Sequence, residues 1–311
     1  MTQAQMPPET VLDALQDILL RHIPSQGILP SAIDGLMLVR REETDTTDRC
    51  FEKPLASVIV QGSKRLLIGR EEYIFHRGQC LVSGIDMPSL SSFLDASPER
   101  PFLSLFFYLD RQIMTDLLLR MPPAGKRAQA DDPAVTVTDA GPEFLEAMLR
   151  LAELLDKPEQ IAIRAPMILR ELHYLLLIGP LGPVLRDLYT QGSQNSQILR
   201  AIAILRRNVG VPVRMEELAR QVGMSLSTLH RHFKTITGFS PLQYHKQLRL
   251  HEAQRLMLVE DMRAASAALS VGYESVTQFT REYKRLFGEP PHRDIQRKRG
   301  LAPADAGACG A

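Results

Sequence analysis

Hydrophobic positions in the last hundred residues recur with helical spacing, and the same pattern occurs twice, fifty residues apart. The recurring apolar side chains are Leu229, Phe233 and Ile236 in the first copy, and Phe279, Tyr283 and Phe287 in the second. A shorter apolar stretch precedes each copy and ends at Gly223 or Gly272. Glycine accommodates the positive φ of a sharp turn between helices. The pattern therefore predicts two helix-turn-helix units.

The opposite face of each second helix carries polar and basic side chains. They are Ser227, Thr228, His230, Arg231 and Lys234 in the first copy, and Thr277, Gln278, Thr280, Arg281 and Lys284 in the second. Arginine can form two hydrogen bonds to guanine, hydroxyls bond several base edges, and lysine contacts phosphate. One such stripe alone is often an ordinary solvated helix face. Its repetition on a duplicated turn motif favours a DNA-contacting surface.

The segment between the copies, from Ser240 to Val259, has a helix start and no internal breaker. Ser240 is a good N-cap, and Pro241 suits the first helical position because its missing N–H is not needed there. Roughly twenty residues make a rod of about 30 Å. Successive major-groove openings on one side of B-DNA are about 34 Å apart. The spacing therefore predicts that one chain holds both second helices in consecutive grooves.

Short apolar runs separated by turn residues precede the helical pattern. They are Ala56–Val60, Arg65–Ile68, Tyr73–Phe75, Cys80–Ser83 and the longer Pro101–Leu109. The spacing predicts a meander of antiparallel strands. The last run is too apolar for an open, solvated sheet, which favours a small barrel or sandwich.

Helical spacing returns in Pro142–Leu155 and again in Gln160–Leu177, where Ile163, Met167 and Leu172 are among the apolar positions. Both helices carry more than one apolar stripe. They either cover the barrel or pair with a second subunit, and the large apolar area favours some contribution to a dimer interface.

Charge divides the chain in the same place as the pattern. Residues 193–300 hold eighteen Lys and Arg against nine Asp and Glu, a net of +9, whereas residues 1–192 hold nineteen against twenty-six, a net of −7. A basic region supplies the nonspecific attraction to phosphates that DNA recognition requires. The polar stretch Gln191–Asn195 is the best linker candidate. We therefore expect domains at 1–192 and 193–300, followed by a flexible tail at 301–311.

The C-terminal region resembles the DNA-binding domain of the AraC/XylS family of bacterial transcription regulators. The matching stretches are Leu218–Gly238, Ser240-Pro241, Gln247–Leu250, Gly272–Ser275 and Pro290-Pro291. The second copy departs from the family habit by placing Ala264, Ala265, Ala267 and Ala268 in its first helix. Small residues bury less apolar area, so we expect the second copy to be the less stable one.

The N-terminal region resembles the effector domain of one AraC-like subgroup. The matching stretches are Gln61–Arg65, Gly78–Ser83, Asp86–Pro88 and Ala96–Phe102. The resemblance implies a cupin-like β-barrel followed by helices that serves as sensor or dimeriser. The expected fold class is thus α+β, with an all-α double helix-turn-helix domain at the C-terminus.

A metal-dependent cupin enzyme is the remote alternative. Such sites need two or three imidazoles and a carboxylate around one metal. Only His22, His76 and His173 lie outside the DNA-binding region, and only His76 falls in the strand meander. The sequence therefore predicts no enzyme activity, no metal and no cofactor.

The sequence thus predicts a DNA-binding transcription regulator that responds to an unidentified small effector bound by the N-terminal domain. The alternative is a ligand-independent architectural protein whose barrel only dimerises. A polar cluster in a sizeable barrel cavity favours the first hypothesis, and a filled barrel the second. Expected partners are double-stranded promoter DNA, a second copy of the chain and, for an activator, RNA polymerase. No stretch approaches twenty apolar residues and Asp13 and Asp17 lie near the N-terminus, so we expect a cytoplasmic location without a membrane partner.

Overall fold

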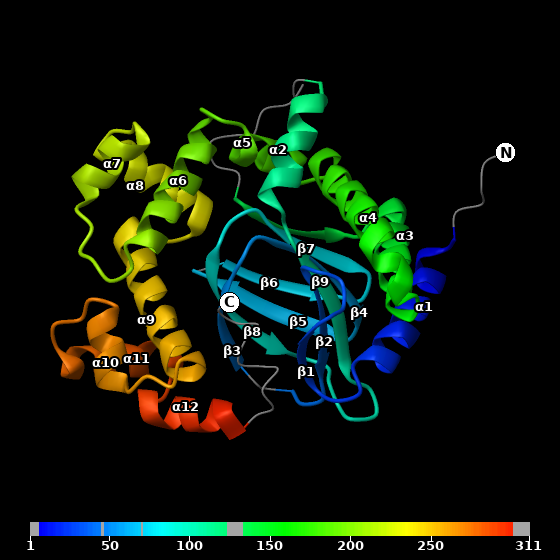
Figure 1. Ribbon diagram of the computed structural model, residues 1–311, viewed down its shortest axis with the longest axis horizontal. Helices are drawn as coiled ribbons and strands as arrows, with labels where there is room; N and C mark the ends of the chain where they lie inside the picture. The colour runs from blue at the N-terminus through cyan, green and yellow to red at the C-terminus, as the bar shows by residue number, and fades with distance from the viewer. Residues whose placement is uncertain (1–5, 45–46, 70, 123–132, 301–311) are drawn as a thin grey trace.

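The computed structural model describes residues 6–44, 47–69, 71–122 and 133–300. Figure 1 shows a β-rich part flanked on one side by helices α1, α3 and α4 and on the other by the C-terminal helices. The predicted α+β class is therefore confirmed. The predicted tail, residues 301–311, lies outside the described residues.

Two antiparallel sheets form the β-rich part of the described chain, which is called the barrel from this point on. The larger sheet has the order β1 (Gly27–Pro30), β2 (Leu36–Arg41), β9 (Phe102–Tyr108), β4 (Leu55–Gln61), β7 (Gln79–Ser83) and β10 (Val135–Asp139). The smaller sheet has the order β3 (Thr47–Glu52), β8 (Met87–Phe93), β5 (Ser63–Ile68) and β6 (Glu71–His76).

Strand β9 shows why both faces of the larger sheet are apolar. Phe102 and Phe106 belong to the core between the two sheets, while Leu103, Leu105 and Phe107 lie in the core under the helices. Successive side chains of a strand point to opposite faces, so a run that is apolar at nearly every position, as here with Ser104 as the exception, is a strand covered on both sides.

The prediction of a sequential meander is wrong in its pairing. Strand β4 pairs with β9 and β7 instead of β5, and β7 pairs with β10 instead of β6. Of the predicted runs, only β5 and β6 are paired neighbours in both sequence and space, from Ser63 opposite His76 to Ile68 opposite Glu71. Pairing between strands that are distant in the sequence leaves no local pattern, because the partner of each strand lies in another segment of the chain.

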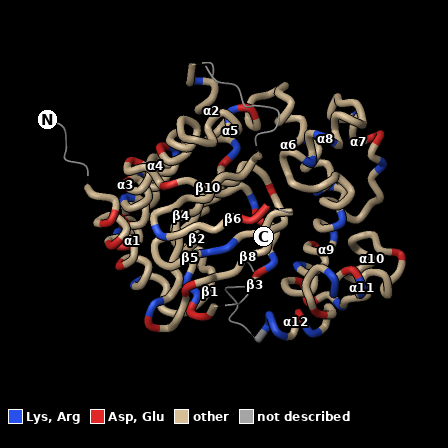
Figure 2. Tube along the Cα trace, turned by 180° about the vertical axis from the view of Figure 1, so that it is seen from behind, with Lys and Arg blue, Asp and Glu red and all other residues tan. Residues whose placement is uncertain are grey.

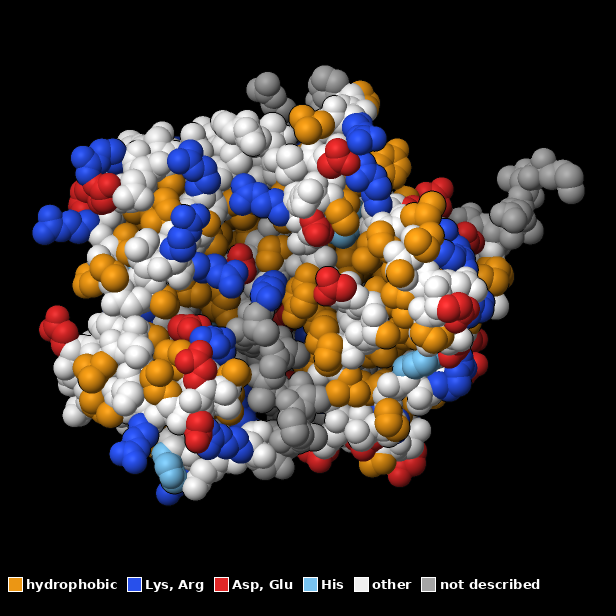
Figure 3. All heavy atoms as spheres, viewed as in Figure 1, with side chains coloured by type: hydrophobic (Ala, Val, Ile, Leu, Met, Phe, Trp, Pro, Cys, Tyr) orange, Lys and Arg blue, Asp and Glu red, His pale blue; other side chains and the backbone are white. Residues whose placement is uncertain are grey.

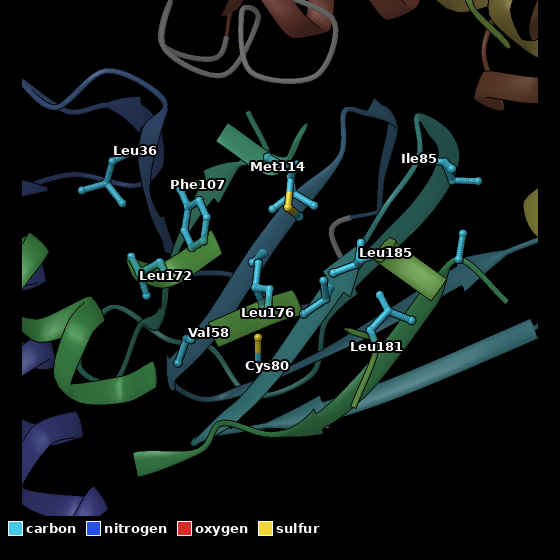
Figure 4. Packing of buried hydrophobic residues seen from close by; sticks show 14 of the residues in the cluster. Leu36, Val58, Cys80, Ile85, Phe107, Met114, Leu172, Leu176, Leu181 and Leu185 are labelled. Carbon is cyan, nitrogen blue, oxygen red and sulfur yellow. The ribbon is translucent and has the colours of Figure 1, made fainter. Parts of the chain in front are cut away.

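Helices pack on the outer face of the larger sheet. They are α1 (Pro8–His22), α2 (Arg111–Arg120), α3 (Pro142–Ala152), the short 3-10 helix η1 (Glu153–Asp156), α4 (Pro158–Ile178) and α5 (Gly182–Tyr189). Figure 4 shows Leu172 and Leu176 of α4 against Phe107 and Cys80 of the sheet. The two predicted helices thus cover the barrel with one face.

The C-terminal part is helical. Its elements are α6 (Gln194–Arg207), α7 (Met215–Val222), α8 (Leu226–Thr237), α9 (Pro241–Val259), α10 (Ala264–Ser270), α11 (Val276–Phe287) and α12 (Pro291–Gly300). The predicted linker is not an open segment, because Ser193 caps α6 by accepting from the amide of Ser196 at 3.0 Å. Asn195 within it is buried.

The helical part lies directly against the barrel. The Tyr244 hydroxyl of α9 donates to the backbone oxygen of Asp86 at 2.8 Å, and Arg206 of α6 pairs with the Asp86 carboxylate. A Cβ on Gly69 would come within 2.9 Å of the Gly238 oxygen, so the two turns meet only because glycine is present. Among the described helices, none combines the length and apolarity needed to cross a membrane.

Candidate nucleic-acid interface

Helices α7 and α8 form the first helix-turn-helix unit. Gly223 ends α7 with φ 75°, and Ser225 caps α8 by accepting from the amide of Thr228 at 3.2 Å. Leu229 and Phe233 of α8 are fully buried. The turn and the apolar stripe thus fix which face of α8 points to solvent.

The solvent face of α8 carries the predicted stripe. Ser227, Arg231 and Lys234 are exposed, and His230 is half-buried. Thr228 is also half-buried, and its hydroxyl oxygen accepts from Ser225 at 2.8 Å. The structure therefore presents Arg231 and Lys234 one helical turn apart and partly engages Thr228 in the helix cap.

Helices α10 and α11 form the second unit, which has a similar arrangement but a longer turn, residues 271–275 instead of 223–225. Gly272 has φ 81°, and Ser275 caps α11 by accepting from the amide of Gln278 at 3.3 Å. The side chains exposed on α11 include Thr277, Gln278, Arg281 and Lys284. The half-buried Thr280 hydroxyl donates to the backbone oxygen of Val276 at 2.9 Å.

The exposed cations of both stripes are available to an external anion. Within the described chain, the ion pairs of the C-terminal helices are made by other cations, such as Lys246 with Glu282 and Arg255 with Glu252. Figure 2 shows the Lys and Arg positions along α8, α9, α11 and α12, and Figure 3 shows basic side chains over α6, α7 and α8. Such a surface attracts phosphates.

Helix α9 links the units. Ser240 and Gln243 form a reciprocal capping box at its start, which stabilises the first turn. Its nineteen residues span about 28 Å. Figure 1 places the two units at opposite ends of this rod.

Two buried carboxylates near the second unit are not predicted from the sequence. Glu282 accepts from the Tyr273 hydroxyl at 2.8 Å and pairs with Lys246 of α9 at 2.6 Å. Asp294 of α12 accepts from the Tyr283 hydroxyl and from Gln254 of α9, both at 2.6 Å. The sequence shows each of them as an acidic residue within an apolar helix face. This pattern does not reveal which side chain the carboxylate pairs with.

The three N-terminal histidines lie in separate places. His22 bonds Asp156 at 2.7 Å, His76 is exposed on β6, and His173 accepts from the amide of Asp110 at 2.8 Å. Burial lowers the pKa of His173. In the part of the chain that the structure describes, no three metal-binding side chains come together.

The space between the two sheets is nearly filled. Its cavity measures about 40 Å³ and is lined by polar groups such as Lys64, Ser91 and Ser104 among apolar neighbours. A larger cavity of about 260 Å³ lies outside the barrel, between the sheet and the end of α4. Cys80, Val82, Phe144, Leu176 and Leu181 are among its lining residues. Any small-molecule site in the N-terminal part therefore has more room under α4 than inside the barrel.

Two family models match the chain in the same order as these parts. "AraC-type transcriptional regulator N-terminus" matches residues 32–184, and "Helix-turn-helix domain" matches residues 218–297. Together with the duplicated, capped helix-turn-helix geometry, they define a class of transcription regulators rather than enzymes. The chain belongs to the AraC/XylS family, as its sequence motifs predict.

Curated relatives agree with this family. The HTH-type transcriptional regulator ExsA of Pseudomonas aeruginosa is 28% identical over 175 residues, which cover 56% of this chain and 62% of ExsA. The HTH-type transcriptional activator RhaS of Pectobacterium carotovorum is 30% identical over 158 residues, covering 50% of this chain and 54% of RhaS. The alignments thus span less than two thirds of these relatives.

Solved structures support the overall fold. Apo ToxT from Vibrio cholerae superposes with a TM-score of 0.59 at 10% identity, covering 86% of this chain and 99% of ToxT. ToxT bound to an unsaturated fatty acid gives 0.57 at 11% identity, covering 84% and 94%. At this identity the likeness concerns the fold alone, and it extends over both parts of the chain.

Proposed function

We propose that the chain is a sequence-specific regulator that reads a split site in double-stranded promoter DNA. The observation that carries this proposal is the pair of equivalent exposed stripes, on α8 and α11, at the two ends of α9. Each stripe offers an exposed arginine and lysine on a basic region. A rod of about 28 Å approximates the spacing of about 34 Å between successive major-groove openings.

Arg231 and Arg281 are assigned to base reading because they occupy equivalent positions near the middle of the two helices. Lys234 and Lys284, one turn further on, are assigned to phosphates. The remaining stripe residues, Ser227, Thr228, His230, Thr277, Gln278 and Thr280, flank these contacts. Thr228 and Thr280 already use their hydroxyls within the helix, so they contribute less than the arginines.

Alanine substitutions test the two arginines. Arg231→Ala and Arg281→Ala should each weaken specific binding by about 1–3 kcal/mol and relax preference at one base step, the two steps lying about one helical turn apart. Arg65→Ala is the matched control because Arg65 is exposed in the barrel and pairs with Glu72 there. Binding selection on randomised DNA gives the preference. Unchanged preference in both variants would contradict the assignment.

The lysines require a different measurement. Lys234→Ala and Lys284→Ala should weaken binding to cognate and random DNA equally and lower the salt slope by about one each. Anisotropy titrations over a range of salt concentrations give both quantities. A loss of discrimination with an unchanged salt slope would show that the roles were exchanged.

The same proposal includes a domain boundary between residues 192 and 193, a homodimer, contact with RNA polymerase and a cytoplasmic location. What supports the division is the change from net −7 to net +9 at this point. What supports a dimer is the gain in affinity when two weak half-site contacts are tethered.

Response to a small effector is a second candidate function, and the cavity of about 260 Å³ under α4 favours it. An apolar cavity of about 150 Å³ already binds benzene in another protein. ToxT, a protein of this fold, has been solved with an unsaturated fatty acid, which is an argument from fold alone. The filled barrel speaks against an effector between the sheets and, taken alone, favours the architectural alternative.

Thermal shift with indole and with short-chain fatty acids tests this candidate. A ligand of the cavity should raise the melting temperature of the native chain, since binding stabilises the folded state. Thr138→Leu should abolish the shift, because Thr138 lines the cavity and the larger side chain occupies it. No shift with any probe would favour the ligand-independent architectural protein.

A further inference from the structure

The loop between α6 and α7, residues 208–214, touches the turn of the second unit directly. The contact joins Gly210 of the loop to Ser270 and Gly272 beside the turn. A Cβ on Gly210 would come within 2.5 Å of the Ser270 backbone oxygen, and a Cβ on Gly272 would clash with the Gly210 backbone oxygen. Figure 1 shows this loop beside α10. The two backbones therefore lie closer together than residues with side chains would allow.

Each side of this contact is held by the core of its own unit. Leu205 near the end of α6 lies in the same buried core as Leu229 of the first unit, so the loop that follows α6 is attached to that unit. Tyr273, next to Gly272, lies in the core of the second unit. The contact thus joins the two units by a second route besides α9.

The two cores meet near the middle of α9. Tyr244 and Leu248 belong to the core of the first unit, whereas Leu250 and Ala253 belong to the core of the second. Arg249 lies at this boundary, between the last α9 residue of one core and the first α9 residue of the other. At this point the relative orientation of the units depends on α9 itself and on the polar contacts around it.

Arg249 contacts both sides of the boundary. Its Nε donates to the Val209 backbone oxygen at 2.9 Å, and its guanidinium carbon lies 5.8 Å from the centre of the Tyr273 ring, within the range of a cation–π contact. The positive charge is favourable beside Val209, because the carbonyl groups at the end of α6 carry partial negative charge. A Cβ on Gly272 would clash with its Nη2 atom. One side chain thus holds the end of α6 against the turn of the second unit.

We propose that Arg249, Gly210 and Gly272 form a clamp that fixes the distance and the rotation between α8 and α11. This role rests on the proposed reading of a split site, and it belongs to positioning residues outside both stripes. One base pair inserted between the two base steps moves the second step by about 3.4 Å and turns it by about 35° around the DNA axis. A clamped pair of units cannot follow this change, so the clamp makes the chain selective for one spacing.

Gly210→Ala opens the clamp with a single methyl group. Gly210 does not have a positive φ, so alanine can adopt its backbone conformation. The added Cβ meets the Ser270 backbone oxygen and must push the loop away from the turn. Gly141→Ala is the matched control, because a Cβ at Gly141 meets nothing within 4 Å.

Arg249→Met removes the polar side of the clamp. Methionine keeps much of the apolar volume but neither the hydrogen bond to Val209 nor the charge over the Tyr273 ring. Arg255→Met is the matched control, because it removes from the same helix a guanidinium group that pairs with Glu252. Arg249→Lys keeps a cation near the end of α6, so it should lie between Arg249→Met and the native chain in both measurements that follow.

Distances between the two units test the clamp without DNA. Pulsed electron spin resonance measures them between spin labels attached through unnatural amino acids at Glu216 of α7 and Ser266 of α10, which are exposed and lie outside both stripes. The native chain and both controls should give one narrow distance distribution. Gly210→Ala and Arg249→Met should each give a broader one, because the second unit is then held by α9 alone. Distributions as narrow as the native one in both variants would overturn the clamp.

Binding to sites of altered spacing tests the consequence for DNA recognition. The probe is a site obtained by binding selection with the native chain, together with versions that hold one base pair more or fewer between the two base steps. The native chain and both controls should bind the altered sites about thirtyfold more weakly than the selected site, and the two clamp variants only about threefold more weakly. Each variant should bind either half-site alone as the native chain does, because both units keep their own cores.

The outcomes separate the clamp from the proposed function. A spacing penalty in both clamp variants as large as that of the native chain would overturn the role of the clamp in spacing. Weaker binding of a clamp variant to the second half-site alone would show that Arg249 or Gly210 merely stabilises the second unit, which also overturns it. A native chain that binds no split site but keeps a narrow distance distribution would instead contradict the proposed function while supporting the clamp.

Discussion

The two helix-turn-helix units share a local design but are held in place differently. The core of the first unit, with Leu229 and Phe233, is continuous with the core under the barrel helices. The second unit has a separate core around the end of α9, with Phe279 and Tyr283. The same duplicated motif is thus anchored to the N-terminal part in one copy and to α9 and α12 in the other.

One pair of equivalent positions accounts for much of the difference. Tyr244 and Asp294 are fifty residues apart, and both are buried. Tyr244 packs on Phe233 with ring centroids 5.2 Å apart and sends its hydroxyl to Asp86 of the barrel. Asp294 instead accepts from Tyr283 within the second unit. The hydroxyl of Tyr244 thus attaches the first unit to the barrel. The carboxylate of Asp294 instead makes its hydrogen bond inside the C-terminal part.

Removing the barrel is the strongest test of this comparison. The fragment 193–300 should be helical and bind a single half-site. Its first unit should lose about 3–6 kcal/mol of stability, because Tyr244 and Phe239 lose the barrel surface that covers them, at about 1.5–3 kcal/mol each. Hydrogen exchange should show α8 less protected than in the full chain and α11 unchanged. Equal losses of exchange protection in α8 and α11 would contradict the separate anchoring of the two units.

Asp294→Ala should act on the other unit. Removing a buried carboxylate leaves the Tyr283 hydroxyl and the Gln254 amide without a partner, and we expect a loss of about 3–5 kcal/mol. Hydrogen exchange should report the loss in α11 and α12 but not in α8. Asp294→Asn, which keeps an acceptor oxygen, is the control and should lose less.

Acid should weaken the contact that His251 of α9 makes with the barrel on one side and the second unit on the other. His251 packs between the rings of Phe51 and Phe287, and burial, with Lys298 and Arg49 nearby, lowers its pKa to about 3. The unfolded chain takes up this proton below about pH 6.5 and the folded chain does not, so its stabilising contribution is complete above pH 6.5 and declines below it.

Denaturant titrations can measure this decline. We expect a loss of about 2 kcal/mol between pH 6.5 and pH 5 from His251. His251→Leu should flatten the curve over this range. The pH dependence that remains in this variant belongs to groups such as His245. Burial lowers the pKa of His245 to about 4. A variant as acid-sensitive as the native chain would exclude His251 as the cause.

Tyr244→Phe is the mildest test. It keeps the ring contact with Phe233 but removes the hydrogen bond to Asp86, so we expect a loss of about 1 kcal/mol. Urea unfolding followed by circular dichroism measures it, and hydrogen exchange should place the change at β8 and α9. Tyr283→Phe is the equivalent change in the second unit, and its effect should stay within α11 and α12.

The sequence by itself determined the features that depend on local spacing. The positive φ of Gly223 and Gly272, the cap at Ser240 and the buried face of α8 all follow from residues within one or two turns of each other. The exposed stripes on α8 and α11 are the reverse side of the same periodicity. The candidate DNA-contacting residues were therefore accessible to sequence reasoning, although their roles stay predictions.

Only the tertiary structure decided which distant segments meet. It placed β4 between β9 and β7, joined Tyr244 to Asp86 across 158 residues, and gave the carboxylates of Glu282 and Asp294 their buried partners. The packing of side chains also leaves only a small cavity between the two sheets and a larger one under α4. Such contacts depend on how whole surfaces pack, and periodicity shows that a face is apolar without showing what covers it.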